Sequence, residues 1–308
     1  MYRAKIIGVG SCLPSKELTN FDLAKRLDTS DAWIRSHTGI RTRYIAGEGE
    51  TLNSLATSAA AEAIKNAGVE ADDIGLIIVA TTTPERIFPS CAVAVQDNLQ
   101  CRSAFAFDLQ AVCAGFVYAL ASANSYIISG QVKAALVIGA DIMSEIVDWD
   151  DRSTCVLFGD GAGAVVLTAA KDAGIISTHL YSDGSLQNIL YTLSGDKLRM
   201  NGQAVFRHAV EKMSASMLAA LESNSLSIDD VDWLIPHQAN IRIINAIAQR
   251  LSISSEKVVI TVDKHANTSA ASIPLAMDHA RGSFSSGDLI ALTALGGGIA
   301  WGSILLRW

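Results

Sequence analysis

Residues 66–83 read NAGVEADDIGLIIVATTT, and residues 223–240, SNSLSIDDVDWLIPHQAN, repeat their order of features. Each segment runs from a helix end through two aspartates into an apolar strand. A second pair follows, since GQVKAALVIGAD (130–141) is matched by SGDLIALTALGGG (286–298). A repeat with a period of roughly 155 residues predicts two packed halves of similar topology, 1–170 and 171–308. Because the identity is weak, the alternative is a chance similarity between α/β units.

Strand-like runs alternate with helical ones along the chain, which predicts an α/β fold in layers. Runs of β-branched residues and alanine are typical of central strands covered on both faces. We expect such strands at 74–81, 103–109, 134–141 and 162–169. Helices are expected at 51–68 and 118–130, both ending at glycine.

Composition excludes several classes of protein. The chain has 308 residues, half of them hydrophobic, and a net charge of −7, so it predicts a large core and no nucleic-acid partner. We expect no membrane span, because the longest apolar runs are strand-sized, and no signal peptide; a cytoplasmic protein is expected. Five cysteines without a C-x-x-C pattern argue against a disulfide framework and against a metal site.

Three polar residues follow predicted strands, where open α/β sheets form their sites. Cys113 follows FAFDL, His237 follows DWLIP, and Asn267 follows VVITVDKHA. A helix start lowers the pKa of a cysteine thiol, because its free N–H groups favour negative charge. Taken singly, a buried core cysteine, a structural histidine and an N-cap asparagine are the alternatives. Together with the glycines of LGGG (295–298), they provide a nucleophile, a base or donor, an amide donor and backbone donors for acyl transfer.

A family resemblance rests on DTSDAWIRSHTGIRTRYIA (28–46), AVCAGF (111–116), FGDGAGA (158–164), PHQANIRI (236–243), HANTSAAS (265–272) and GGGIAWGS (296–303). With these motifs the whole chain resembles the β-ketoacyl-[acyl-carrier-protein] synthase III enzymes of the thiolase-like superfamily. The resemblance implies a five-layered αβαβα fold with two similar halves from an internal duplication. The Asn in NTSAAS separates this group from elongating synthases, which have Cys-His-His, and from thiolases, which have a second catalytic cysteine.

The resemblance also implies a reaction, the decarboxylative condensation that starts fatty-acid synthesis. Cys113 takes the acyl group of an acyl-CoA, expected to be acetyl-CoA, and the carbanion from malonyl-acyl carrier protein attacks it. His237 and Asn267 donate hydrogen bonds to the thioester oxygen of the malonyl group, and assisting the ionisation of Cys113 is a second expected role of His237. The N–H groups of Cys113 and Gly297 form the oxyanion hole. The CoA thioester is a substrate, and no cofactor is implied.

Binding residues carry over from the family position by position. The implied contacts to CoA and pantetheine are Trp33, Arg152, Gly202, Phe206, Ala239 and Asn240, and those of the acyl pocket are Phe88 and Leu295. The implied carrier-protein contacts are Arg207, Gln238, Arg242 and Arg250. His37, Val112 and Leu295 depart from the common family residues, which leaves the CoA contacts and the pocket size open.

The expected partners are acyl-CoA, malonyl-loaded acyl carrier protein and, from the resemblance, a second copy of the chain in a homodimer. An acidic carrier protein needs a basic patch on this acidic enzyme. Two alternatives remain at this point. One is a related condensing enzyme that uses a longer or branched acyl-CoA starter, and the other is a non-enzymatic carrier-binding or redox-sensing protein with Cys113 as its switch.

Overall fold

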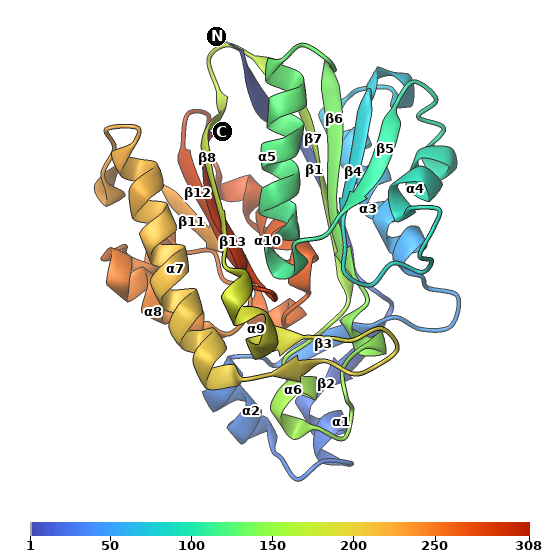
Figure 1. Ribbon diagram of the computed structural model, residues 1–308, viewed down its shortest axis with the longest axis vertical. Coiled ribbons are helices and arrows are strands. Elements are labelled where there is room, and N and C mark those ends of the chain that lie inside the picture. The colour runs from blue at the N-terminus through green and yellow to red at the C-terminus, as the bar shows by residue number, and fades with distance from the viewer. Residues whose placement is uncertain (1) are drawn as a thin grey trace.

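The computed structural model describes residues 2–308, which form two β-sheets with helices between and outside them (Figure 1). In the first sheet the strand order is β1 (Arg3–Cys12), β7 (Gly161–Ala170), β6 (Ala134–Asp141), β4 (Leu76–Ala80) and β5 (Phe105–Leu109). β1, β7 and β6 pair antiparallel, whereas β6, β4 and β5 pair parallel. β4 and β6 are buried along their whole length and β7 along most of it, as their apolar runs predict. β5 differs from the prediction, because it is an edge strand and only partly buried.

The second sheet repeats this pattern with one strand fewer. Its order is β8 (Gly174–Ser182), β13 (Ala300–Arg307), β12 (Leu289–Gly296) and β11 (Trp233–Pro236). The first two pairs are antiparallel and the last is parallel. At the place of β5 there is a single parallel bridge between Leu234 and Val258.

Six helices complete five layers. α3 (Leu52–Ala67) and α4 (Cys91–Leu99) cover the outer face of the first sheet, and α7 (Gly202–Glu222) and α8 (Ile241–Leu251) lie outside the second. α5 (Gly115–Ile128) and α10 (Ser272–Ala280) form the middle layer, in contact with strands of both sheets (Figure 1). The αβαβα prediction is confirmed, and so are the predicted helices, with small shifts of their ends.

The remaining elements gather at one end of the molecule (Figure 1). They are β2 (Lys16–Thr19), α1 (Asn20–Ala24), α2 (Asp31–Thr38), β3 (Thr42–Ile45), α6 (Arg152–Cys155), β9 (Leu190–Tyr191), β10 (Arg199–Met200) and α9 (Val262–His265). Within residues 2–308, no helix combines the length and the apolar character needed to cross a membrane.

The repeated sequence segments occupy equivalent places in the two sheets, so the repeat in the sequence is also a repeat in the structure. In each segment the two aspartates form a short 3-10 turn, Ala71–Asp73 or Ile228–Asp230, which leads into β4 or β11. The side chain of the last aspartate in each turn accepts a hydrogen bond from the backbone N–H three residues earlier. Asp73 accepts from Glu70 at 3.0 Å, and Asp230 accepts from Ser227 at 2.7 Å. Local capping therefore explains why this pattern recurs.

The middle layer begins with a second equivalent pair of turns. The 3-10 turn Val112–Ala114 precedes α5, and Ser269–Ala271 precedes α10. Their spacing in sequence equals that of the repeated segments 66–83 and 223–240, and Val112 (φ 49°) and Ser269 (φ 51°) both take a left-handed conformation. This conformation is uncommon for residues other than glycine and is often found at functional sites.

Candidate active site

Cys113 lies in a turn that close packing holds in place. A Cβ added at Gly296 would lie 2.8 Å from the Cys113 backbone nitrogen, so the end of β12 presses directly against the turn. A Cβ at Gly115 would meet the Cβ of Ala80 at 3.1 Å. The small residues of AVCAGF therefore allow close backbone approach, and the Cys113 side chain is almost fully buried.

The ionisation of Cys113 differs from our expectation. The pKa of the thiol is raised to about 12, and burial is the main cause; within this balance the Ser269 hydroxyl lowers the pKa and the nearby Asp141 carboxylate raises it. The helix start was expected to lower it, but removal of the thiol from water has the larger effect. At neutral pH Cys113 is therefore a protonated thiol that must lose its proton during attack.

His237 follows β11 and enters the same cavity from the other half of the molecule. Its backbone N–H donates to Thr293 O at 2.8 Å, which continues the pairing of β11 with β12. Burial lowers the pKa of the imidazole to about 3, so the ring is neutral. Its Nδ1 atom lies 2.6 Å from the hydroxyl oxygen of Ser272 on α10.

Asn267 is held by three hydrogen bonds that fix the direction of its amide. Its backbone N–H donates to Leu157 O at 2.9 Å, and its carbonyl accepts from Gly159 N at 3.0 Å. The side-chain oxygen accepts from the backbone N–H of Ser269 at 2.9 Å. Because this oxygen is engaged, the two amide hydrogens are the groups that Asn267 offers to the cavity.

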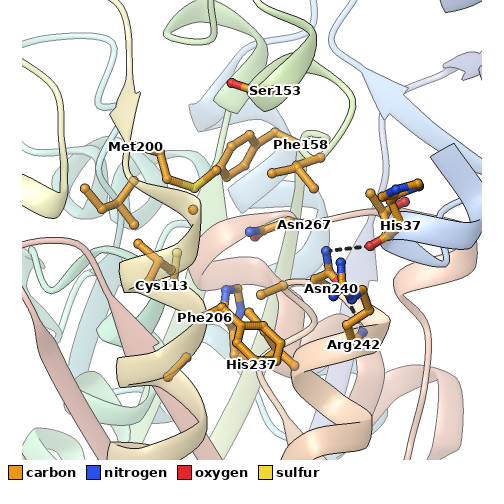
Figure 2. A pocket seen from close by; sticks show the side chains of 18 of the residues that line it. His37, Cys113, Ser153, Phe158, Met200, Phe206, His237, Asn240, Arg242 and Asn267 are labelled. Carbon is orange, nitrogen blue, oxygen red and sulfur yellow. Dashed lines mark hydrogen bonds between the residues drawn. The ribbon is translucent and has the colours of Figure 1, made fainter. Parts of the chain in front are cut away.

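The three side chains line one cavity of about 460 Å³ (Figure 2). Cys113, His237 and Asn267 lie around one part of it, whereas His37, Asn240 and Arg242 lie together on another side. Of the predicted binding residues, those that line the cavity are Trp33, Gly202, Phe206, Ala239, Asn240, Arg242 and Leu295. The structure thus brings the predicted nucleophile, its two helpers and most of the predicted CoA contacts to one cavity.

Trp33 and Arg152 face each other directly. The Arg152 guanidinium carbon lies 4.9 Å from the centroid of the Trp33 ring, and the His37 ring stacks on Trp33 at 4.3 Å. Trp33 and Arg152 are predicted contacts of CoA. If its adenine base stacks between them, they must be about 7 Å apart, which is two van der Waals contacts. Binding of a base there therefore requires Arg152, which also pairs with Asp28 at 3.7 Å, to swing away.

Gln238 corrects one prediction, because it is 1% exposed and cannot touch a docked carrier protein. Its amide nitrogen donates to Pro236 O at 2.7 Å and to Val259 O at 3.1 Å. Its amide oxygen accepts from the backbone N–H groups of Thr261 and Val262. Gln238 is thus a structural brace between the end of β11 and the start of α9.

Phe88 does not reach the cavity of its own chain. Its side chain is 83% exposed, and Ile87 beside it is 98% exposed. The predicted place of Phe88 in an acyl pocket is therefore not formed within one chain. Leu295, the other predicted pocket residue, is buried and lines the cavity.

The glycine triplet contacts the nucleophile turn at one end and lines a second cavity at the other. Gly296 is the residue that packs against the Cys113 backbone, whereas Gly297 lies against Leu190 O, 2.8 Å from where its Cβ would be. Gly297 also lines a second cavity of about 840 Å³ together with Val112. This second cavity lies behind the nucleophile turn.

The predicted basic residues lie on the two helices outside the second sheet. Arg207 on α7 and Arg242 and Arg250 on α8 are exposed. The Arg242 guanidinium carbon lies 5.9 Å from the centroid of the Phe206 ring, which lines the cavity. Of the three, Arg242 is the one that lines the cavity.

Asp141 is a further residue of the site that was not predicted from the sequence. This fully buried carboxylate at the end of β6 accepts from Thr82 N at 2.7 Å and from Ala270 N at 3.2 Å. It thereby ties the first sheet to the turn that follows Asn267. The signal was an aspartate at the end of the apolar run AALVIGAD, where a charged residue needs buried partners.

A cysteine thiol, a neutral imidazole and an oriented amide around one cavity define an acyl-transfer site. Comparison with known proteins agrees with this class. Residues 107–184 match the family 3-Oxoacyl-[acyl-carrier-protein (ACP)] synthase III, and residues 221–308 match its C-terminal family. Within residues 2–308 there is no cluster of three or more side chains suited to hold a metal ion.

Curated relatives match over the whole chain. The chain is 55% identical to the beta-ketoacyl-[acyl-carrier-protein] synthase III of Ehrlichia ruminantium (strain Gardel) and 55% identical to that of Wolbachia pipientis wMel, with 100% of both chains covered in each case. The crystal structure of 3-oxoacyl-[acyl-carrier-protein] synthase III from Aquifex aeolicus VF5 superposes with a TM-score of 0.97 at 50% identity, covering 99% of this chain and 100% of that one. The chain therefore belongs to the 3-oxoacyl-[acyl-carrier-protein] synthase III family and is an acyltransferase.

Proposed function

We propose that this enzyme condenses acetyl-CoA with malonyl-acyl carrier protein, giving acetoacetyl-acyl carrier protein, CoA and CO₂, and so starts fatty-acid synthesis in the cytoplasm. The observation that carries the proposal is the meeting of Cys113, His237 and Asn267 in one cavity. The names of relatives with 55% identity support the same reaction.

In the first half-reaction the Cys113 sulfur attacks the thioester carbon of the acyl-CoA. The bond from that carbon to the CoA sulfur breaks, and the proton of Cys113 leaves with CoA as its thiol. The product is an acyl thioester on Cys113. Trp33, Phe206, Ala239 and Asn240 line the path for the CoA arm, and Arg152 swings from Trp33 to admit the adenine.

In the second half-reaction the malonyl group loses CO₂, and its electrons form an enolate on the carrier-bound thioester. His237 and the amide hydrogens of Asn267 donate to the enolate oxygen, which stabilises the developing charge. The enolate carbon attacks the acyl carbon and expels the Cys113 sulfur, which takes up a proton. Two neutral donors suit this step, because it requires no proton transfer from the substrate.

The tetrahedral intermediate carries a second oxyanion, which the N–H groups of Cys113 and Gly297 stabilise in this proposal. Its support is the close packing of Gly296 on the Cys113 backbone, which brings the following residue near the nucleophile. The acyl chain itself extends past Leu295, beside the second cavity that Val112 lines.

The proposed assembly is a homodimer, and the exposure of Ile87 and Phe88 supports it. Large apolar side chains 98% and 83% exposed are typical of a surface that a partner covers. We further propose that the two duplicated halves divide at 170/171. The strands of the first sheet end at Ala170 and those of the second begin at Gly174, which supports this division.

The starter preference tests the proposed reaction against its alternative. With malonyl-carrier protein held constant, we expect kcat/KM for acetyl-CoA to exceed that for longer and branched acyl-CoAs by about 10-fold or more. The measurement is product formation across a panel of acyl-CoAs. If longer or branched chains acylate Cys113 while acetyl-CoA does not, the alternative of a different starter is correct.

Reversal of an exposed charge on α8 is expected to weaken carrier-protein binding. Arg250→Glu should raise KM for malonyl-carrier protein by about 10-fold at low salt and leave the rate of acylation by acetyl-CoA unchanged, because Arg250 lies outside the cavity. Lys65→Glu on α3 is the matched control, since it makes the same charge change on the opposite outer layer. Equal effects of both variants would argue against a patch on α8, and the effect should fade at high salt.

A further inference from the structure

Ser272, the first residue of α10, contacts His237 directly. It is 2% exposed, and its hydroxyl oxygen lies 2.6 Å from His237 Nδ1. The backbone N–H of Gln238 donates to the same oxygen at 3.3 Å. The hydrogen bond with Ser272 can therefore determine which ring nitrogen of His237 carries the proton.

The hydrogen bonds of the hydroxyl indicate its direction. Its oxygen accepts from Gln238 N. Within residues 2–308, the acceptor within reach of the hydroxyl hydrogen is His237 Nδ1. The reverse direction, with Nδ1–H donating to Ser272, would leave a buried hydroxyl hydrogen without an acceptor, which is unfavourable. We propose that Ser272 is a positioning residue that holds the neutral His237 ring with its proton on Nε2.

Burial lowers the pKa of His237 and keeps the ring neutral, so only one of its two nitrogens carries a proton. With Nδ1 accepting from Ser272, Nε2 is a donor toward the cavity that His237 lines. The inference deepens the proposed function and rests on it for its kinetic consequences. In this tautomer Nε2 has no lone pair for the Cys113 proton, so His237 serves decarboxylation and does not act as the base in acylation.

One short segment thus orients both donors of the site. The backbone N–H of Ser269 engages the side-chain oxygen of Asn267, and the hydroxyl of Ser272 engages Nδ1 of His237. With these atoms engaged, the side-chain N–H groups of Asn267 and the Nε2–H of His237 remain available to the cavity that both residues line. The segment 267–272 is therefore the part of the fold that sets the hydrogen-bond polarity of the site.

The direct test is nitrogen NMR of the full-length protein labelled with ¹⁵N-histidine. In the unchanged protein we expect His237, assigned by its absence in His237→Gln, to show an unprotonated Nδ1 and a protonated Nε2. In Ser272→Ala the Nδ1–H tautomer should appear. A protonated Nδ1 in the unchanged protein, or an unchanged tautomer in Ser272→Ala, would overturn the proposal whether or not the enzyme condenses the proposed substrates.

Kinetics provides a second readout. Ser272→Ala should lower kcat for CO₂ release from malonyl-carrier protein by about 10-fold, with KM unchanged and the rate of Cys113 acylation retained. Ser272→Thr, which restores a hydroxyl, should recover most of the loss. If the unchanged protein releases no CO₂, the proposed function fails and the NMR result alone decides the inference.

A matched control separates this role from general loosening of the core. Ser216 on α7 has a buried hydroxyl 2.6 Å from the hydroxyl of Ser303, away from the cavity. Ser216→Ala should cost similar thermal stability and leave both the His237 tautomer and CO₂ release unchanged. An equal loss of CO₂ release in both variants would overturn the proposal, as would no loss in Ser272→Ala.

Discussion

Cys113→Ser should abolish the acyl-enzyme and lower condensation by at least about 1,000-fold, because a serine hydroxyl is a far weaker nucleophile than a thiol in this buried turn. Serine is nearly the same size as cysteine, so the close contacts of Gly115 and Gly296 around the turn are kept. The measurement is intact-mass analysis after incubation with acetyl-CoA, followed by detection of the condensation product.

Cys12→Ser is the control for this experiment. Cys12 is more exposed than Cys113 and lies at the end of β1, outside the cavity. We expect this variant to be acylated and active like the unchanged protein. An adduct that persists in Cys113→Ser, or that disappears in Cys12→Ser, would show that Cys113 is not the nucleophile.

His237→Ala and Asn267→Ala should each slow the release of CO₂ from malonyl-carrier protein by about 100- to 1,000-fold, the usual loss for one donor to a developing oxyanion. Acylation of Cys113 should remain within about tenfold of normal, because the enolate forms only in the second half-reaction. The two half-reactions are measured separately, by trapping CO₂ and by mass analysis of the acyl-enzyme.

Two further variants sharpen this prediction. Asn267→Asp keeps the shape of the side chain but replaces the amide donors with oxygens, so it should be as damaging as Asn267→Ala. His265→Ala is the control, because His265 is close in sequence to Asn267 but does not line the cavity. If acylation fails as completely as decarboxylation in His237→Ala, the histidine acts in both half-reactions.

Much of the fold was predictable from local patterns. Both copies of the aspartate pair form the same capped turn before a strand, which is why the repeat is visible in the sequence. The central strands were visible because burial on both faces requires continuous apolar runs, as in β4 and β6. The strand predicted in VVITVDKHA before Asn267, the counterpart of β5, is wrong: only the bridge of Val258 with Leu234 forms, and α9 follows it.

The site was predictable in its residue types but not in its electrostatics. Neighbouring motifs identified Cys113, His237 and Asn267, because reactive groups gather at strand ends. The raised pKa of Cys113 depends on how completely the second half covers the thiol, which no local pattern contains. Gln238 was misassigned for the same reason, since a polar residue beside an exposed helix gives no sign that its amide is engaged in the interior.

The role of Gly297 in the oxyanion hole stays a prediction, and so do the roles of the CoA, acyl-pocket and carrier-protein residues. Spacing within GGG cannot distinguish neighbouring glycines, and only the packing identifies Gly296 as the one that presses on the nucleophile turn. The position of Phe88 depends on a surface that one chain alone does not cover.

The way the two halves join has a consequence for the order of the chain. Gly174, at the start of β8, pairs with Arg307 at the end of β13, and a Cβ on Gly174 would lie 2.5 Å from Ala4 O in β1. Both ends of the chain therefore lie beside the connection between β7 and β8, on the same side of the molecule (Figure 1). A circularly permuted gene that begins at 174, passes from 308 through a short linker to 2 and ends at 170 would keep every strand pair. We therefore expect the site to form whichever half comes first in the chain, as long as the two halves pack against each other in the same way.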